Sequence, residues 1–399
     1  MTLSKHLLLA AGLLAGAPGA YAADPVKIGD INSYTAIPAF TVPYRNGWQL
    51  AMDEINKAGG VLGGRRIEVI SRDDQGRPDG AASAADQLIG PDGAVLLMGT
   101  LLTQTAQTVS EIARQRSRPF LAVQPLSDSL VWSRGNAYTF RLRTSAAMQT
   151  AMLAEQAAKL PAKRWAILAP DFEQGQTLAN DFKQHLKSRR PDITFTQELS
   201  SPLGKLDAAS VVDALSQAKP DALFNVTFGG DLIRLVREGN AKGLFPKLPV
   251  VSPLTGEPDY LEVMADDVPA GWIVTGYPWY DIKTPEHRKF VEAYAAAYGE
   301  DPRLASLLGY DAMKAVAAAL DKAGSTDPAK LAAAFEGLTV ATPSGSITFR
   351  AADHQSTMGS WIGKTQLQDG AGIMTDWRYI DGAAVLPSAE AAKKLRPAN

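Results

Sequence analysis

The sequences VKIGDI at residues 26–31 and IEVISR at residues 67–72 flank the segment RNGWQLAMDEINKA at residues 45–58. The two outer runs are short and rich in valine and isoleucine, as buried strands are. In the middle segment, apolar side chains recur at the spacing of one helix face, and Gly59-Gly60 then supplies a stop signal. This order predicts a βαβ unit, in which a helix joins and covers two parallel strands.

The same alternation continues along most of the chain. Further strand-like runs lie at residues 94–98, 120–123, 165–169, 222–226 and 273–277. Further helices are expected at residues 80–90, 103–115, 147–160, 174–187, 208–218, 231–241, 285–298 and 304–323. Strands that alternate with amphipathic helices form parallel sheets with helices on both faces, so we predict an α/β fold with doubly wound sheets.

The length of 399 residues favours two lobes over one domain. Residues 138–144 end the first run of alternation with a strand that leads into a new helix, which places a lobe boundary near Arg143. Back-to-back helices follow Val274, and a strand-rich tail runs from residue 347 to residue 380, so the chain should cross between the lobes several times. We assign residues 24–143 and 276–342 to lobe I, and residues 144–275 and 343–399 to lobe II.

The composition excludes several classes of protein. Hydrophobic residues make up 46% of the chain and charged residues 21%, which is typical of a soluble globular protein. Lys and Arg total 40 against 42 Asp and Glu, so no basic field exists to bind nucleic acid or an anionic membrane surface. There is no cysteine, which excludes disulfides, thiolate nucleophiles and cysteine-ligated metals.

The first 22 residues have the pattern of a secretory signal peptide. Lys5 precedes an apolar run at residues 7–14, and Ala20-Tyr21-Ala22 offers small residues at both positions that determine cleavage. The apolar run is shorter than the roughly 20 residues that a membrane-spanning helix needs. We therefore expect cleavage after Ala22 and an exported protein without membrane insertion.

The segment PYRNGWQLAMDEINKAGGVLG at residues 43–63 resembles the first helix and turn of the periplasmic leucine/isoleucine/valine-binding proteins. Asp73-Asp74 and residues 81–88, 138–143 and 271–275 follow in that family's order and approximate spacing. The resemblance implies a type I periplasmic binding protein, with two doubly wound lobes joined by three crossovers. Such a protein closes on a small ligand and delivers it to the membrane permease of an ABC importer, and we expect it to be a monomer.

Two hydroxyl-bearing loops are candidates for an anion clamp. Ligands of open parallel sheets bind beyond the carboxyl ends of strands, where the first N–H groups of helices are unpaired. Thr103 follows the strand-like run 94–98 and Ser127 follows the run 120–123. Each hydroxyl could cap its own helix or bind a carboxylate, and the position of both residues in the family favours the carboxylate. Their predicted partners in ligand contact are Leu102, Gln104 and Leu126.

The other candidate ligand contacts surround this clamp. Phe172 and Phe228 resemble the family's aromatic wall, although either could pack beneath its own loop. Residues 34–41 are expected to form the loop after the first strand and to shape the apolar end of the pocket. Tyr277 lies near an expected crossover, so packing in the hinge is as consistent with its position as ligand contact. The remaining predicted contacts are Tyr34, Phe40, Gly229 and Glu257.

The sequence leaves the ligand open between an amino acid and an aromatic acid. Relatives that bind α-amino acids use an acidic residue of the second lobe for the ammonium group, and Leu254 stands at that place here. If Glu257 or Asp231 faces the cleft, charge pairing favours an amino acid, and otherwise an uncharged tail is indicated. Leu101 and Leu102, where relatives often have small or polar residues, favour a hydrophobic or aromatic carboxylate.

No catalytic or metal-binding pattern is present. Gly363-Lys364-Thr365 lacks the glycine that a phosphate-binding loop requires five residues earlier, and no nucleophile elbow or His-Glu-x-x-His helix occurs. Asp73-Asp74 are expected to be a solvated strand end. The histidines are expected at the surface, namely His185, His287 and His354. We predict a solute-binding protein without cofactor; a ligand-sensing regulator of the same fold and, remotely, a secreted α/β hydrolase are the alternatives.

Overall fold

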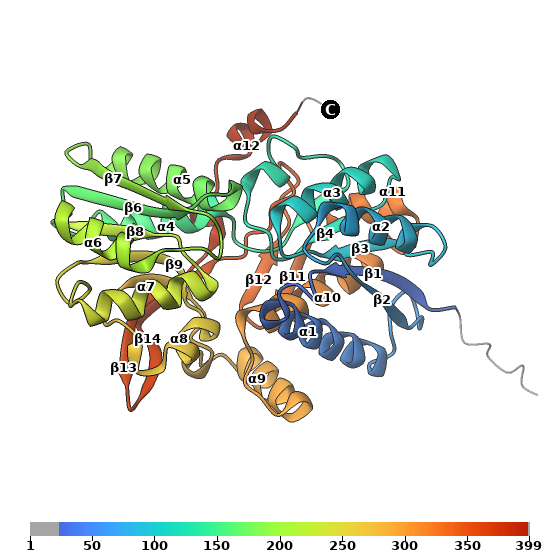
Figure 1. The fold of residues 1–399 in the computed structure, drawn as a ribbon. Helices are drawn as coiled ribbons and strands as arrows, with labels where there is room; N and C mark the ends of the chain where they lie inside the picture. Colours follow the sequence, from blue (N-terminus) through green and yellow to red (C-terminus); the bar gives the residue numbers. More distant parts are fainter. Residues whose placement is uncertain (1–23, 398–399) are drawn as a thin grey trace, which may run out of the picture.

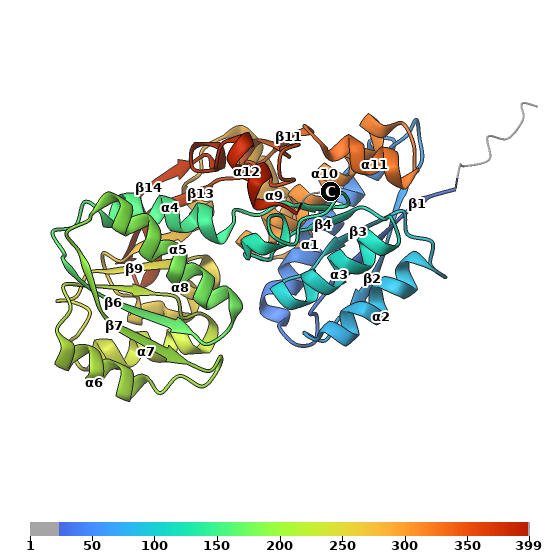
Figure 2. The ribbon, with the colours of Figure 1, turned by 90° about the horizontal axis from the view of Figure 1, so that it is seen from above.

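The computed structural model describes residues 24–397 of the protein. The predicted signal peptide, residues 1–22, therefore lies outside the described residues. Figures 1 and 2 show two α/β lobes side by side, each built around its own sheet. The prediction of two doubly wound lobes with parallel sheets is confirmed.

Lobe I contains a five-stranded parallel sheet of order β2-β1-β3-β4-β5. Its strands are β1 (Val26–Asn32), β2 (Ile67–Asp73), β3 (Leu96–Gly99), β4 (Phe120–Ala122) and β5 (Thr139–Arg141). The helices that follow its first three strands are α1 (Pro38–Lys57), α2 (Pro78–Ile89) and α3 (Thr103–Gln115). Later segments that pack with them are α10 (Leu304–Ala323), α11 (Pro328–Phe335), β11 (Thr339–Thr342) and β12 (Gly345–Thr348).

Lobe II contains a seven-stranded sheet of order β14-β13-β10-β9-β8-β6-β7. Its parallel strands are β6 (Arg164–Pro170), β7 (Thr194–Ser201), β8 (Ala222–Asn225), β9 (Val250–Gly256) and β10 (Ile273–Gly276). The antiparallel hairpin of β13 (Ser360–Gln368) and β14 (Ala371–Ile380) extends the sheet beyond β10. Its helices are α4 (Ala146–Ala157), α5 (Glu173–Arg189), α6 (Ala208–Ala218), α7 (Gly229–Ala241) and α8 (Pro258–Met264). The remaining helices are α9 (Pro285–Tyr298) and α12 (Ala389–Leu395).

The chain passes between the two sheets after β5, after β10 and before β13, which makes three crossovers. The first and third lie against each other. The Arg141 N–H donates to the His354 carbonyl at 3.0 Å, and the Ser356 N–H donates back to the Arg141 carbonyl at 2.9 Å. The Thr144 hydroxyl donates to the Met358 carbonyl at 2.9 Å. These bonds make a short ladder at the hinge.

Helices α1 and α10 pack closely through two glycines. A Cβ atom at Gly47 would lie 1.9 Å from the Ser306 carbonyl oxygen, and one at Gly309 would lie 2.0 Å from the Tyr44 carbonyl oxygen. Any side chain at either position would collide with the backbone of the other helix. The late helix α10 is thereby held against the first helix of lobe I.

Strand β14 forms one edge of the lobe II sheet. The Tyr280 hydroxyl, in the short 3-10 turn Trp279–Asp281, donates to the Met374 carbonyl at 3.1 Å. The same oxygen accepts the Met374 N–H at 2.6 Å. One phenol therefore satisfies both backbone groups of Met374 in this edge strand.

Several predictions about local structure were wrong. Residues 38–41 are not a loop, because α1 begins at Pro38, and proline at the first helical position loses no hydrogen bond. His287 and His354 are buried, not at the surface. The His287 Nε2 bonds the Tyr277 hydroxyl at 2.7 Å, and the His354 ring stacks on Phe140 with centroids 4.1 Å apart. Burial lowers the pKa of both histidines to about 4.

The expectation of a solvated strand end at Asp73-Asp74 is also wrong for Asp74. This residue is fully buried, and one of its carboxylate oxygens accepts the Ser33 hydroxyl and the Gly76 N–H, each at 2.7 Å. Its other carboxylate oxygen has no hydrogen-bond partner within residues 24–397. Asp74 fixes the turn after β2, whereas Asp73 remains partly exposed.

Candidate functional site

The carboxyl ends of the lobe I strands carry the two predicted hydroxyls. Thr103 is the first residue of α3 and is 3% exposed, and its Oγ1 has no hydrogen-bond partner among the described residues. Leu102 is half-buried at the N-cap position, and Gln104 is exposed. A buried hydroxyl without a partner beside unpaired helix N–H groups is suited to hold an anionic group.

Ser127 contacts a carboxylate of the other lobe. Its hydroxyl donates to Glu173 Oε1 at 3.0 Å, and the Ser129 hydroxyl donates to the same oxygen at 3.2 Å. The Gln107 amide nitrogen donates to both Glu173 oxygens, at 3.1 and 3.3 Å. We call Gln107, Ser127 and Ser129 the cradle. Because Glu173 is the first residue of α5, these bonds join lobe I to lobe II.

The loop that carries Ser127 is held by the buried guanidinium of Arg141. Arg141 donates to the Ser127 carbonyl, to the Leu126 carbonyl at 3.1 Å and to Asp128 Oδ1 at 3.1 Å. Asp128 Oδ2 in turn accepts the Ala147 N–H at 2.9 Å, near the start of α4. Leu126 itself is buried in a hydrophobic cluster with residues of lobe II. This ion pair therefore links the cradle loop to the first crossover.

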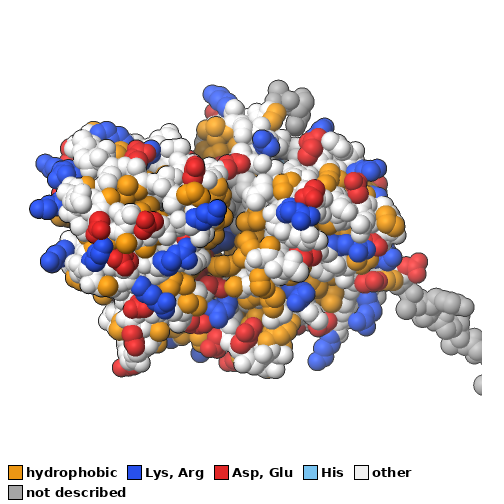
Figure 3. Space-filling model, viewed as in Figure 1, with side chains coloured by type: hydrophobic (Ala, Val, Ile, Leu, Met, Phe, Trp, Pro, Cys, Tyr) orange, Lys and Arg blue, Asp and Glu red, His pale blue; other side chains and the backbone are white. Residues whose placement is uncertain are grey.

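Aromatic side chains line the boundary between the lobes. The rings of Phe172 and Phe228, which follow the adjacent strands β6 and β8, lie 5.8 Å apart between centroids. Gly229 has a φ of 58° at the start of α7. Phe40 of α1 contacts Tyr260 of α8, with centroids 6.0 Å apart, and so also bridges the lobes. Figure 3 shows this boundary hollowed in the face in view, with hydrophobic side chains on both sides.

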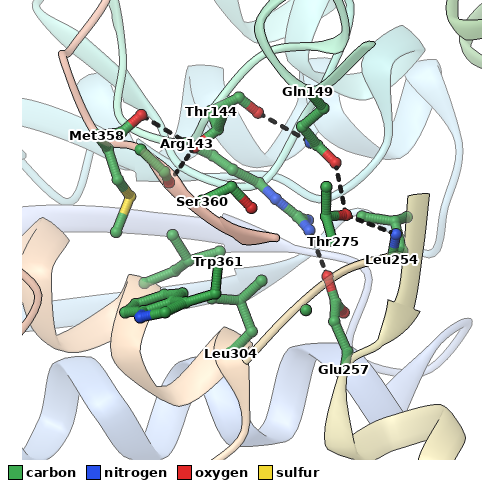
Figure 4. Close-up of a pocket in the computed structure, with 13 residues that line it drawn as sticks. Arg143, Thr144, Gln149, Leu254, Glu257, Thr275, Leu304, Met358, Ser360 and Trp361 are labelled. Carbon is green, nitrogen blue, oxygen red and sulfur yellow. Dashed lines mark hydrogen bonds and ion pairs between the residues drawn. The ribbon is translucent and has the colours of Figure 1, made fainter. Parts of the chain in front are cut away.

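A small cavity lies among the three crossovers (Figure 4). Arg143 reaches into it and donates to Glu257 Oε1 at 2.7 Å, and both side chains are largely buried. Burial raises the pKa of Glu257 to about 7, against the opposing effect of Arg143. The cavity measures about 20 Å³. That space holds a water molecule or two, whereas a cavity of roughly 150 Å³ is needed for a benzene ring.

The walls of this cavity are fixed by their own hydrogen bonds. The Thr275 hydroxyl donates to Gln149 Oε1 at 3.2 Å, and the Gln149 amide donates to the Thr144 carbonyl at 3.2 Å (Figure 4). The Leu254 N–H donates to the Thr275 hydroxyl at 2.8 Å. Leu254 has a φ of 67°, an unfavourable value for a bulky residue, and such strain concentrates at functional sites.

Three other residues that the sequence analysis weighed for ligand contact are hydrogen-bonded to other groups of the protein. The Tyr34 hydroxyl donates to the buried Asp30 at 2.6 Å inside lobe I. Tyr277 is fully buried, with its hydroxyl on His287. Asp231 accepts the Gly204 and Leu206 N–H groups at 2.7 and 3.1 Å and so fixes a loop of lobe II. Of the two candidate acids, Glu257 is therefore the one that reaches the region between the lobes.

Sequence reasoning missed the partners of these groups. The sequence places Arg143 only at a lobe boundary and gives Glu173 no role. Neither Gln107 nor Tyr260 was considered. The one sequence signal for Glu173 is its position directly after Phe172, a predicted ligand contact. Its hydrogen-bond partners could not be predicted because they lie in lobe I.

The described part of the chain holds neither a metal-binding cluster nor a membrane-spanning helix. Within residues 24–397, no group of three or more His, Cys, Asp or Glu side chains is placed to hold a metal ion. Among the helices of that range, none combines the length and the apolar character needed to cross a membrane.

Two doubly wound lobes that meet over polar strand ends define a two-lobed binding protein. The chain belongs to the periplasmic binding protein family, whose model matches residues 25–371. The leucine-, isoleucine-, valine-, threonine- and alanine-binding protein of Pseudomonas aeruginosa is 25% identical over 350 residues, covering 86% of this chain and 90% of that one. Leu/Ile/Val-binding protein homolog 7 of Brucella suis is 26% identical over 404 residues, covering 96% and 98%. The resemblance found in the sequence is confirmed.

Solved structures share the fold. The solute-binding protein of an ABC transporter from Rhodopseudomonas palustris BisB5, in complex with 3,4-dihydroxybenzoic acid, has a TM-score of 0.81 and 24% identity, covering 90% of this chain and 98% of that one. The amino acid ABC transporter substrate-binding protein of Pseudomonas fluorescens Pf-5 has a TM-score of 0.82 and 22% identity, covering 94% and 99%.

Proposed function

We propose that the protein is the periplasmic substrate-binding component of an ABC importer and captures a small carboxylate by closure of its lobes. The observation that carries this proposal is the cradle, where hydroxyl and amide donors of lobe I hold the carboxylate of Glu173. The names of similar proteins, which include binders of branched-chain amino acids and of a benzoic acid derivative, agree with this class of ligand.

In this proposal, Thr103 and Ser127 clamp the carboxylate of the ligand. The unpaired Thr103 hydroxyl and the N–H groups at the start of α3 supply donors, and the helix dipole favours negative charge there. Ser127 exchanges Glu173 for the ligand. Phe172 and Phe228 cover the apolar body, since apolar walls supply most of the attraction in such sites.

An aromatic acid is the first candidate and an aliphatic amino acid the second. The ammonium group of an amino acid would need an acid, but Glu257 already pairs with Arg143 and Asp231 is engaged in its own lobe. An uncharged ring needs no acidic partner, and it can pack against the aromatic wall of Phe172 and Phe228. We therefore rank benzoate-like acids above leucine.

The proposal has further parts. A signal peptide cleaved after Ala22 exports the protein, which acts as a monomer with a permease. It neither alters its ligand nor binds nucleic acid. The predicted lobe boundaries were residues 24–143 and 276–342 for lobe I and residues 144–275 and 343–399 for lobe II; we now propose that lobe I also includes β12 (Gly345–Thr348), which pairs with β11. Intact mass of the periplasmic form tests the cleavage site, and recovery of the ligand unchanged tests the absence of catalysis.

Calorimetry with benzoate, 4-hydroxybenzoate, phenylalanine and leucine tests the ligand class. Thr103→Ala and Ser127→Ala should each weaken binding by roughly 1 to 3 kcal/mol with little loss of stability, because each removes one donor to a charged group. Thr108→Ala is the control, since its hydroxyl bonds the Gln104 carbonyl within α3. Unchanged affinity in both clamp variants would remove the clamp from the proposal.

A further inference from the structure

The carboxylate in the cradle belongs to the protein itself. Glu173 of lobe II accepts hydrogen bonds from all three cradle residues of lobe I, at 3.0 to 3.3 Å. The Arg134 guanidinium donates to Gln107 Oε1 at 3.2 Å, which leaves the amide nitrogen of Gln107 directed at Glu173. The cradle is thus oriented as a receptor for a carboxylate.

The position of Glu173 at the start of α5 does not by itself explain its contact with the cradle. An acidic residue in the first turn of α5 is favoured by the helix dipole, but that preference is met without any bond to the other lobe. No Lys or Arg pairs with Glu173 in the described structure, and its cradle partners are neutral donors. A carboxylate held only by neutral donors can be exchanged for another carboxylate without separating an ion pair.

We propose that Glu173 is an internal substitute for the carboxylate of the ligand. In the absence of ligand, Glu173 occupies the cradle and holds the lobes together. An incoming carboxylate takes over Ser127 and releases Glu173, while the aromatic walls keep the lobes closed around the ligand. The displacement step rests on the proposed function, whereas closure by Glu173 does not.

A tethered competitor sets the affinity of the site. The effective concentration of a group on a short tether is on the order of millimolar, so a free carboxylate has to exceed that level or bring additional contacts. A ligand with an apolar body brings those contacts, whereas acetate or chloride does not. Glu173 is therefore a positioning residue that selects against small carboxylates.

Fluorescence energy transfer between the lobes tests closure without any ligand. The chain has no native cysteine, so dyes on Lys57→Cys in α1 and Gln184→Cys in α5, both exposed positions, report the separation of the lobes. Glu173→Ala should raise the ratio of open to closed protein by about fivefold to thirtyfold, the range that one or two such hydrogen bonds supply. Glu173→Gln, which keeps an acceptor oxygen, should restore part of the closed population.

The control and the double variant sharpen this test. Glu198→Ala removes an exposed acid of lobe II whose partner, Lys183, is 2.8 Å away in the same lobe, and it should leave the transfer unchanged. Ser127→Ala removes one of the three cradle donors, so it should open the protein less than Glu173→Ala does, and the combined variant should open it no further than Glu173→Ala alone. Unchanged transfer in Glu173→Ala, or fully additive effects, would overturn closure by Glu173.

Acetate is the probe for displacement, so this arm does not depend on the natural ligand. Acetate well above the millimolar range should open the wild-type protein relative to chloride at equal ionic strength, and should leave Glu173→Ala unaffected. Equal transfer in acetate and chloride would overturn displacement. A failure of every carboxylate in calorimetry would refute the proposed function instead, while the transfer measurement would still decide closure.

Discussion

Replacing Arg141 with methionine should destabilise the protein severely. The Arg141 side chain is fully buried, and it donates to Gln355 Oε1 at 2.5 Å and to Asp128 Oδ1 at 3.1 Å, besides two carbonyls of the cradle loop. Methionine fills much of the same space but donates no hydrogen bond. Asp128, whose side chain is 9% exposed, would lose its cation.

The size of this loss of stability depends on the groups that stay buried without the Arg141 donor. Removal of one partner of a buried ion pair costs roughly 3 to 5 kcal/mol, because the other charge stays buried without compensation. The carbonyls of Leu126 and Ser127 lose their donor as well, at about 1 kcal/mol each, and the added apolar contacts of methionine return part of this loss. We expect the free energy of unfolding to fall by about 4 kcal/mol.

Urea denaturation followed by tryptophan fluorescence measures this change. Arg378→Met is the matched control, since Arg378 pairs with Glu155 at 2.8 Å with both side chains about half exposed. Exposed pairs contribute roughly 0 to 1 kcal/mol, so this variant should be nearly neutral. If Arg141→Met loses no more stability than Arg378→Met, the assignment of Arg141 as the anchor of the cradle loop is refuted.

Two further predictions concern Asp181 and Gly309. Burial and the nearby Asp128 raise the pKa of Asp181 to about 7, above its ordinary value of 3.8, so the folded protein holds this proton more tightly than the unfolded chain. The resulting penalty is small near pH 4, grows between pH 4 and 7 and levels off above 7, so Asp181→Asn should stabilise the protein at pH 8 by roughly 1 to 3 kcal/mol and hardly at pH 4. Equal effects in urea titrations at the two pH values would contradict this. Gly309→Ala should lower the free energy of unfolding by roughly 1 to 3 kcal/mol or more, because its Cβ would lie 2.0 Å from the Tyr44 carbonyl oxygen. The exposed Gly230→Ala is its control, and similar melting temperatures for both variants would count against the close packing of α1 and α10.

The regular elements were predictable where local signals agree. The expected helices at 103–115, 208–218, 285–298 and 304–323 match the structure, and the last three have a capping residue or a helix breaker at one end or both, namely Asp207, Pro285, Gly299 and Gly324. Strand β7 was absent from the prediction because it is an outer strand whose mostly polar residues alternate between exposed and half-buried positions. Strand β9 contains Pro253, which indicates a loop in the sequence, and the positive φ of its neighbour Leu254 has no counterpart in the sequence pattern.

Some contacts of the candidate site could likewise be predicted from the sequence, and others could not. Phe172 and Phe228 follow neighbouring strands of one sheet, so their proximity follows from topology that the sequence pattern indicates. The bond between Ser127 and Glu173 depends on how one lobe sits on the other, which no local pattern encodes. The pairing of Arg143 with Glu257, which are 114 residues apart, has the same origin.

The hydrogen bonds of the Tyr280 hydroxyl also bear on how the edge strand β14 could pair with a second copy of the protein. An outermost strand with free amide and carbonyl groups can recruit a strand of a neighbouring copy. Here the groups of Met374 are already taken by Tyr280, and β14 is irregular nearby, where Asp376 has a φ of 50°. A second copy is thereby hindered from pairing with β14 at Met374, which lowers the tendency of this edge to aggregate.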